Sequence, residues 1–240
     1  MFSTRAAIRG FAAAAMLAPA LASAAIVVAS SGPSAGQFPV GRKLDDSAQI
    51  TLRAGDVVTI LDARGTRVLR GAGNFAVTQQ TGASRASMFA LLTRDRASQR
   101  VRTGAVRGEA GLGPVRSPNL WYVDLTRSGT QCVTPSGGLQ LWRATASKPA
   151  SFAITGLRGV GNAKVSFPVG AMVAPWDSLR LPITPGASYA IAGERGIVIR
   201  NVTFAVLPAL PATPEALAAA LIDRGCTAQL ELLSATLAQS

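Results

Sequence analysis

The sequence contains no histidine and only two cysteines among its 240 residues. The absence of histidine excludes Ser-His-Asp and Cys-His catalysis, and it excludes zinc sites that use imidazole ligands. Two thiols that lie about 94 positions apart cannot supply a four-thiolate metal site. The sequence therefore predicts neither a cofactor nor a metal site, and it removes many common classes of hydrolase and metalloenzyme.

Aromatic residues make up only 5% of the chain and charged residues only 15%, whereas 48% of the residues are hydrophobic. A disordered chain combines low hydrophobicity with high charge, so this composition predicts a folded protein with an aliphatic core. Acidic residues are scarce as well. The 24 Lys and Arg residues against 12 Asp and Glu residues leave a net charge of +12.

A single long uncharged apolar run occurs, and it lies at the start of the sequence. Phe11–Leu21 follows Arg5 and Arg9 and precedes the small residues Ala22-Ser23-Ala24. This order is typical of a cleavable export signal over residues 1–24. The run is shorter than the roughly 20 apolar residues of a spanning helix; an uncleaved anchor or a core helix is the alternative. We therefore expect a periplasmic or secreted protein with no transmembrane segment after cleavage.

Removal of that segment removes two arginines and no acid, so the net charge falls from +12 to +10. Outside the cytoplasm a basic protein meets lipid headgroups, lipopolysaccharide and acidic glycans. We therefore expect an envelope protein or an anionic polymer as the partner, and export argues against nucleic acid. The alternative is that scattered arginines only keep the protein soluble.

Alternating hydrophobicity predicts a mainly β fold in two parts. Residues 25–80 hold four or five short strands, with a hairpin loop at 62–65, and predict a small barrel or sandwich-like domain. Residues 118–207 hold seven or more alternating segments separated by turns. They predict a second, antiparallel β-sandwich-like domain.

The remaining segments have a different character. Within residues 81–117 the pattern predicts a short helix over 87–93. The Arg/Gly-rich stretch around it has no periodicity, which predicts a linker. Residues 208–240 predict a C-terminal helical tail, with Thr213 as N-cap and Gly225 ending the first helix. A solvated flexible connection is the alternative to an anion-binding role for the linker. The candidate anion-contacting residues in the linker are Arg94, Arg96, Arg100, Arg102 and Arg107.

The even number of cysteines in an exported chain favours a disulfide between Cys132 and Cys226 over two free thiols. Redox-active pairs usually have C-x-x-C spacing, so this bridge is predicted to be structural. It would attach the helical tail to the early strands of the 118–207 domain.

Two polar patterns resemble functional motifs. Gly156–Gly161 is rich in glycine like a phosphate-binding loop, but a strand pattern follows it where a helix would be required, which favours a hairpin loop. A paired-carboxylate hydrolase needs two acids across a cleft. Asp56 and Asp62 instead occupy turn positions, where aspartate caps the backbone.

Four aromatic residues could form a platform for sugar or lipid: Trp121, Tyr122, Trp142 and Trp176. Trp121 alternates with Val123 and Leu125, which predicts core packing. Trp142 has the opposite parity to Leu141 and is the candidate exposed aromatic. The alternative is that it is an isolated surface aromatic, which is common.

The segment Leu52–Arg70 reads LRAGDVVTILDARGTRVLR. The segment contains, in order, Gly-Asp, a hydrophobic strand, a turn, Gly-Thr and a second strand. This order resembles that of the FecR-type periplasmic β domain. That resemblance implies a β fold over about 30 residues. FecR-type sensors carry a cytoplasmic segment and a spanning helix before this domain, where this chain has the predicted export signal. The chain as a whole also resembles exported proteins of α-proteobacteria, which implies no activity.

Two functions from different classes follow from these patterns. We predict a non-catalytic periplasmic binding or scaffold module for a protein or anionic envelope partner, because no nucleophile-plus-base arrangement is visible. β modules joined by linkers commonly serve recognition, although fold alone does not fix function. The alternative is an envelope hydrolase that uses Ser or Asp without His.

Overall fold

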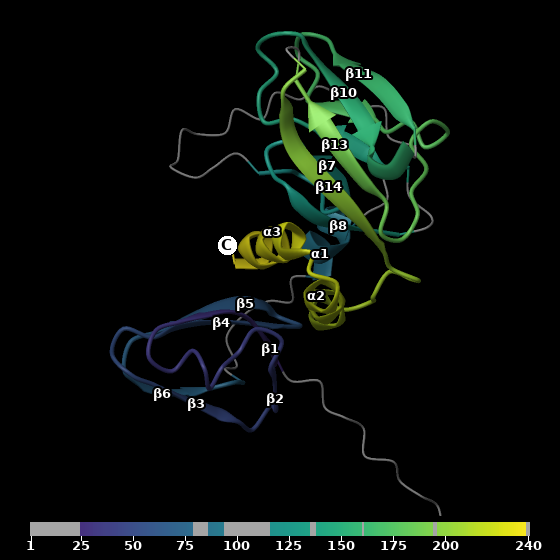
Figure 1. Cartoon of the computed structure of the whole chain (residues 1–240). Coiled ribbons are helices and arrows are strands. Elements are labelled where there is room, and N and C mark those ends of the chain that lie inside the picture. The colour runs from purple at the N-terminus through teal and green to yellow at the C-terminus, as the bar shows by residue number, and fades with distance from the viewer. Residues whose placement is uncertain are drawn as a thin grey trace, which may run out of the picture.

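The computed structural model describes residues 25–78, 86–93, 116–134, 138–159, 161–193 and 196–238. The described chain is mainly β, with several antiparallel sheets and a short C-terminal helical region, as predicted (Figure 1). The predicted signal at 1–24 and the central part of the predicted linker lie outside the described residues. Among the residues so placed are Arg94, Arg96, Arg100, Arg102 and Arg107.

Residues 25–78, here called the first β unit, form two sheets. A four-stranded sheet has the order β2–β1–β4–β5, and a two-stranded sheet pairs β3 with β6. The hairpin predicted at 62–65 joins β4 to β5, as its register shows. The strands are β1 (Ala25–Ser31), β2 (Lys43–Leu44), β3 (Gln49–Leu52), β4 (Val57–Asp62), β5 (Gly65–Arg70) and β6 (Gly73–Ala76).

The first four residues of strand β1, Ala25–Val28, are buried on both faces of the strand. Ala25 and Val27 face the core of the first β unit together with Ile50 and Val58, whereas Ile26 belongs to a cluster with the C-terminal helices. A strand covered on both sides reads as a continuous apolar run, which is what the sequence shows here. The first β unit therefore needs a cover on its outer face.

The turn before β4 is built around Asp56, which is 1% exposed. Its carboxylate accepts the backbone N–H of Ser34 at 2.8 Å and that of Arg53 at 2.6 Å. Burial opposes ionisation of this carboxylate, but these hydrogen bonds outweigh burial and hold the pKa of Asp56 below its usual value. Gly32 (φ +104°) lies beside it, and a Cβ there would come within 2.6 Å of Oδ1, so only glycine fits.

Residues 118–207, here called the second β unit, form a sandwich of two sheets. Their strand orders are β11–β10–β13–β14–β8 and β12–β9–β7. Most neighbours are antiparallel, as predicted, but β14 pairs with β8 and β7 pairs with β9 in parallel. The strands are β7 (Tyr122–Asp124), β8 (Gly129–Val133), β9 (Gln140–Trp142), β10 (Ala150–Gly156), β11 (Asn162–Phe167), β12 (Val173–Pro175), β13 (Ser188–Ala192) and β14 (Val198–Val206).

Aromatic side chains fill the centre of the second β unit. The Trp176 ring meets the rings of Tyr189 and Phe204 edge-to-face, with centroids 5.1 and 5.2 Å apart. Such contacts add to the stabilisation from burial. The glycine-rich segment at 156–161 is a hairpin loop, as predicted, and joins β10 to β11 through the 3-10 turn η1 (Leu157–Gly159).

Three helices complete the chain: α1 (Ala86–Thr93), α2 (Pro214–Asp223) and α3 (Thr227–Ala238). The Thr213 hydroxyl accepts the backbone N–H of Ala216 at 3.2 Å, so the predicted N-cap is confirmed. Gly225, with φ +69°, supports the turn that ends α2, because glycine adopts this conformation without strain.

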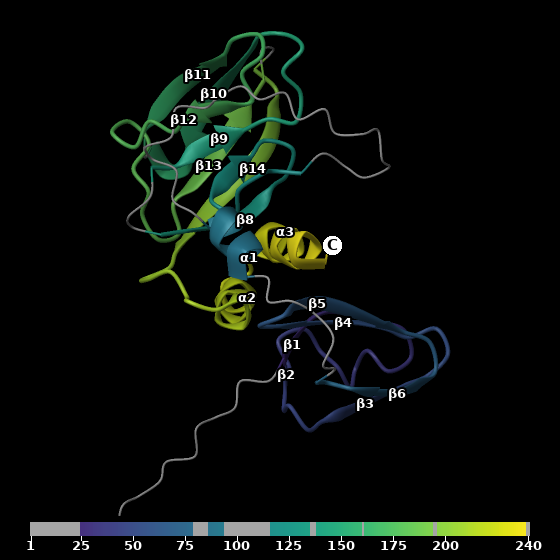
Figure 2. The same ribbon diagram turned by 180° about the vertical axis from the view of Figure 1, so that it is seen from behind.

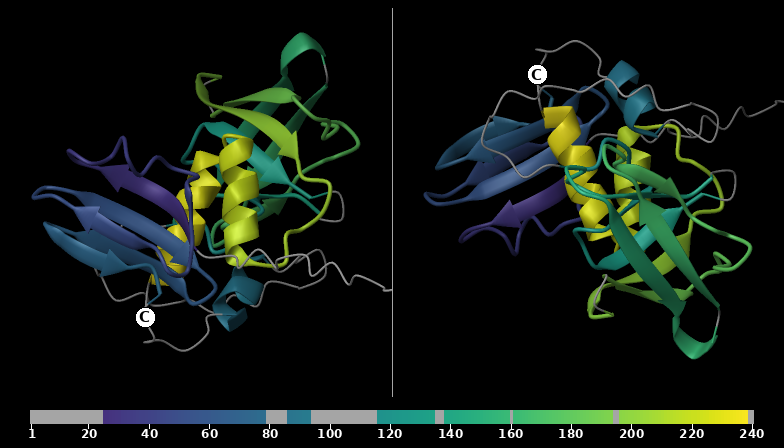
Figure 3. Two further views of the ribbon diagram at one scale, coloured as in Figure 1. Left: turned by 90° about the horizontal axis from the view of Figure 1, so that it is seen from below. Right: turned by 90° about the horizontal axis from the view of Figure 1, so that it is seen from above.

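Helices α2 and α3 lie between the two β units (Figures 1, 2 and 3). Helix α2 packs against β1 and β4, and α3 packs against β5 on one side and β8 on the other. The buried cluster at this junction, here called the shared core, takes residues from both β units and from all three helices. It includes Ile26, Val28, Leu61, Phe89, Leu92, Leu120, Cys132, Leu207, Leu217, Leu221, Cys226, Leu230, Leu233 and Leu237.

The turn at Asp56 predicts a specific pH dependence. The pKa of Asp56 in the folded state lies below the ordinary value of 3.8. The ionised carboxylate therefore contributes its full stability above that value, and this stability is lost as the pH falls through the folded-state pKa. Asp56→Asn removes this ionisation. Between about pH 5 and pH 2, the free energy of unfolding of the wild type should therefore fall more steeply than that of the variant. Urea titrations across this range measure both, with the exposed Asp45→Asn as control. Parallel curves for wild type and Asp56→Asn would contradict this account of the turn.

Candidate functional site

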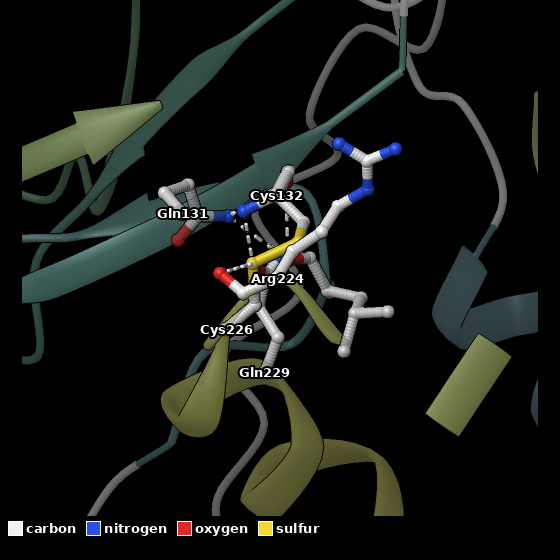
Figure 4. Close-up of a disulfide and its surroundings, with 6 residues drawn as sticks. Gln131, Cys132, Arg224, Cys226 and Gln229 are labelled. Atoms are coloured by element: carbon white, nitrogen blue, oxygen red, sulfur yellow. Dashed lines mark hydrogen bonds between the residues drawn. A yellow bond between two sulfur atoms is a disulfide. The ribbon is translucent and has the colours of Figure 1, made fainter. Parts of the chain in front are cut away.

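The two cysteines meet at the junction of the second β unit and the helices. Cys132 in β8 and Cys226, next to α3, form the predicted disulfide, with Cα atoms 5.8 Å apart (Figure 4). Both residues are fully buried, and neither cysteine is free. The bridge attaches the helical segment to the second β unit, as expected, and its burial is typical of a structural disulfide.

A glutamine beside the disulfide completes this attachment. The Gln229 side chain accepts the backbone N–H of Cys132 at 2.6 Å and donates to the carbonyls of Cys132 and Leu120, both at 2.9 Å (Figure 4). Strand β8 is the last strand of its sheet, so its outer edge has backbone groups without a neighbouring strand. Gln229 takes the place of such a strand at Cys132.

Sequence reasoning missed Gln229. It is 3% exposed, and a polar side chain buried to this extent needs hydrogen-bond partners. Its position three residues after Cys226 puts both on one side of α3, where they face the same strand. That spacing was the available signal.

The expectation that Trp142 is an exposed aromatic is wrong, because its side chain is only 1% exposed. Strand β9 is the central strand of its sheet, and Leu141 beside it is also fully buried. Alternation along a strand separates buried from exposed residues only where one face of the strand meets solvent. Both faces of β9 are covered, so alternation along the strand does not distinguish inside from outside.

The four aromatic residues do not form a surface platform. Trp176 is buried in the second β unit, as is Trp142. Trp121 is half-buried, packs against the shared core as expected, and donates its indole N–H to the Thr93 carbonyl at 2.9 Å. Trp121 therefore ties α1 to the second β unit.

Several aspartate side chains stabilise turns by accepting backbone hydrogen bonds. The Asp62 carboxylate accepts the N–H of Arg64 at 2.8 Å, and Asp124 accepts that of Thr126 at 2.7 Å. The contacts of Asp56 and Asp62 confirm the turn roles predicted for these two residues, and Asp124 has the same role in the second β unit. In the part of the chain that the structure describes, no group of three or more His, Cys, Asp or Glu side chains is placed to hold a metal ion.

Positive charge is not confined to the linker. Residues 118–207 contain eight Lys and Arg against three acids, whereas residues 25–80 contain six against four and residues 208–240 contain one against three. Two acids of the second β unit, Asp124 and Asp177, bind their own turns. The sequence reasoning placed the anion-contacting residues in the linker alone. The second β unit provides a further basic surface that is described, with exposed Lys148, Arg158, Lys164 and Arg180, whereas the exposed Arg127 pairs with Glu231 of α3 at 2.6 Å.

One arginine of this unit has a structural role. Arg143 is 7% exposed, and its guanidinium donates to the carbonyls of Ala171, Lys148 and Pro168 at 2.7–2.9 Å. It also lies over the Phe167 ring, 5.0 Å from the centroid. These contacts direct its charge to backbone dipoles within the fold, so Arg143 does not belong to the surface available to a partner.

A pocket of about 440 Å³ lies where the chain leaves β14 and enters α2. Leu207, Pro208 and Ala220 give it an apolar wall, and Asp223 and Arg224 add one charge of each sign. One negative and one positive side chain in the same wall largely cancel, so the pocket attracts neither anions nor cations strongly. The pocket therefore adds little to the positive field of the second β unit.

No model of a known protein family, no curated protein and no solved structure matches the chain. Among the described residues, none of the helices is both long and apolar enough to cross a membrane. The resemblance to the FecR-type domain stays a prediction.

The disulfide predicts an ordered loss of structure. Replacing Cys132 and Cys226 together with Ala opens a loop of about 95 residues and should lower the free energy of unfolding by about 2–5 kcal/mol. Hydrogen exchange should rise first in α2 and α3, while β3 and β6, on the far side of the first β unit, keep their protection. Gln49→Leu, an exposed change in β3, serves as control. Unchanged stability, or equal loss of protection in β3 and α3, would contradict the prediction.

Proposed function

We propose that this protein is an exported, non-catalytic binding or scaffold module of the bacterial envelope, and that its partner is anionic. The observation that carries the proposal is the set of exposed cations on the second β unit, Lys148, Arg158, Lys164 and Arg180, against two described acids, Asp124 and Asp177, that bind their own turns. A basic surface attracts anionic partners and raises the rate of encounter with them. The linker arginines, which follow the same charge pattern in the sequence, would extend this surface.

The uneven charge of the chain supports an oriented contact. The helical segment 208–240 is acidic, with three acids against one arginine, and the second β unit is basic. The two therefore respond in opposite ways to a negatively charged surface, so the second β unit is the side that we expect to face the partner.

The way in which the fold uses its buried polar groups favours recognition over chemistry. The Gln229, Arg143 and Asp56 side chains all bind backbone groups. A buried catalytic group needs polar atoms that remain free for a substrate. The proposal that the protein is not an enzyme rests on the use of these three side chains.

The proposed location rests on two features. Residues 1–24 have the order of an export signal, and the disulfide suits an oxidising compartment such as the periplasm. A scaffold that works outside the cytoplasm also gains from the covalent bridge, which holds the helical segment on the second β unit.

Binding to envelope fragments isolated from the native cell tests the proposal. The fraction of protein bound should fall steeply as NaCl rises from 50 to 500 mM, because exposed charges are screened over about 8–10 Å at physiological salt. Lys148→Glu with Lys164→Glu should weaken binding more than Arg53→Glu with Arg70→Glu, the matched pair in the first β unit. A triple variant in which Arg96, Arg100 and Arg102 are changed to Gln measures the contribution of the linker. Equal binding by all variants at every salt concentration would refute the proposal.

A further inference from the structure

Two turns of the second β unit each present an exposed leucine followed by an arginine. Leu157 and Arg158 lie in η1, and Leu179 and Arg180 lie in the turn after Trp176. The exposed fraction is 98% for Leu179 and 46% for Leu157. The coil of η1, drawn in teal-green, lies at the margin of the molecule remote from the first β unit (Figure 3).

The turn that carries Leu179 is anchored at both ends. Trp176 and Leu181 are buried, and the Trp176 indole N–H donates to the Leu181 carbonyl at 2.8 Å. Between them, Asp177 accepts the N–H groups of Leu179 and Arg180 at 3.2 and 3.1 Å. Leu179 is therefore held in solvent by an ordered turn, at the cost of exposing almost its whole apolar side chain to water.

The η1 turn holds Arg158 in an unfavourable conformation. With φ 66° and ψ 25°, Arg158 is the one non-glycine residue with positive φ in the described part of the chain. Side chains with a Cβ disfavour this left-handed region. Gly159 beside it adopts φ +78°. Such an outlier motivates a functional hypothesis when the side chain concerned is exposed and charged.

The two turns meet at their backbones. A Cβ at Gly161 would lie 2.0 Å from the Arg180 carbonyl oxygen, so the two backbones touch where only glycine fits. The Gly161 carbonyl also accepts the N–H of Gly156 at 2.7 Å, which closes the η1 loop. We call Leu157, Arg158, Leu179 and Arg180 the Leu-Arg tip.

The tip is positively charged. Asp177 is its one neighbouring acid within the described turns; its carboxylate binds the turn backbone and lies 3.7 Å from the Arg180 guanidinium. Arg158 has no acidic partner among the described residues, and the exposed Lys164 follows on β11. Apolar and cationic side chains are thus presented together on adjoining turns.

We propose that the Leu-Arg tip docks the second β unit onto an anionic lipid surface. The leucines would enter the boundary between headgroups and acyl chains, and the guanidinium groups would bind lipid phosphates. A polyanionic glycan would use the arginines but would offer no apolar medium to the leucines. This inference rests on the proposed function, because it names the anionic partner of the same basic unit.

Vesicle binding tests the proposal with the exported full chain. At 100 mM NaCl the protein should bind vesicles of phosphatidylglycerol and phosphatidylcholine (3:7) and bind pure phosphatidylcholine at least tenfold more weakly. Leu179→Ser should weaken binding to the anionic vesicles by about tenfold, because a leucine side chain no longer leaves water. Arg158→Gln and Arg180→Gln should each weaken it by about fivefold.

Matched controls separate the tip from the rest of the surface. Leu210, which is 46% exposed like Leu157, lies outside the tip, so Leu210→Ser should bind as the wild type does whereas Leu157→Ser should not. Both native cysteines are bonded, so Leu179→Cys accepts an environment-sensitive fluorophore, whose emission should shift to the blue on anionic vesicles. Wild-type binding by Leu179→Ser, or an unshifted emission at position 179, would overturn the proposal.

The failure of this inference can be told from that of the proposed function. If the tip variants and the wild type bind envelope fragments alike, in a salt-dependent way, but the wild type does not bind anionic vesicles, the lipid docking is wrong and the anionic partner is another envelope component. If envelope fragments are not bound at all, the proposed function itself is wrong.

Discussion

Burial of the C-terminal helices between the two β units is the interaction on which the rest of the structure depends. The outer face of the first β unit contributes Ile26 and Leu61 to the shared core, and the helices contribute Leu217 and Leu233, all of them at most 2% exposed. Strand β1 has no polar face to turn toward water, so without the helices its outer side would be exposed. The hydrophobic effect therefore fixes the first β unit on the helices, and the disulfide with Gln229 fixes the helices on β8.

This arrangement separates a structural end from the end at which we propose binding. The second β unit uses β8 and the shared core to hold the helices, while its turn η1 lies at the margin away from the first β unit (Figure 3). Near the helices, the Gln229 side chain binds backbone atoms of β8, and positive charge is carried by exposed side chains of the second β unit such as Arg158 and Lys164. The proposed scaffold function follows from this division, because a rigid body can present its basic side in one orientation.

Local patterns allowed the sequence to predict the hairpin at 62–65, the N-cap at Thr213 and the turn roles of the aspartates, since each depends on neighbours in the chain. The disulfide was predictable because only one pairing exists. The burial of Trp142 was not, because alternation reports which residues share a face and not whether a second layer covers it. The parallel pairing of β14 with β8 joins segments about 70 residues apart, and no local signal encodes it. For the same reason the sequence predicted the C-terminal helical tail but not its contact with both β units.

Native-state hydrogen exchange of Leu233→Ala tests the shared core most directly. Leu233 is fully buried between the units, and its truncation should lower stability by about 2–5 kcal/mol. The account predicts faster exchange of β1 and β4 in the first β unit as well as of β8 in the second. Leu139→Ala, a truncation in the core of the second β unit alone, should speed exchange only there. If Leu233→Ala left β1 and β4 with wild-type exchange rates, the first β unit would not depend on the helices, and the account would be wrong.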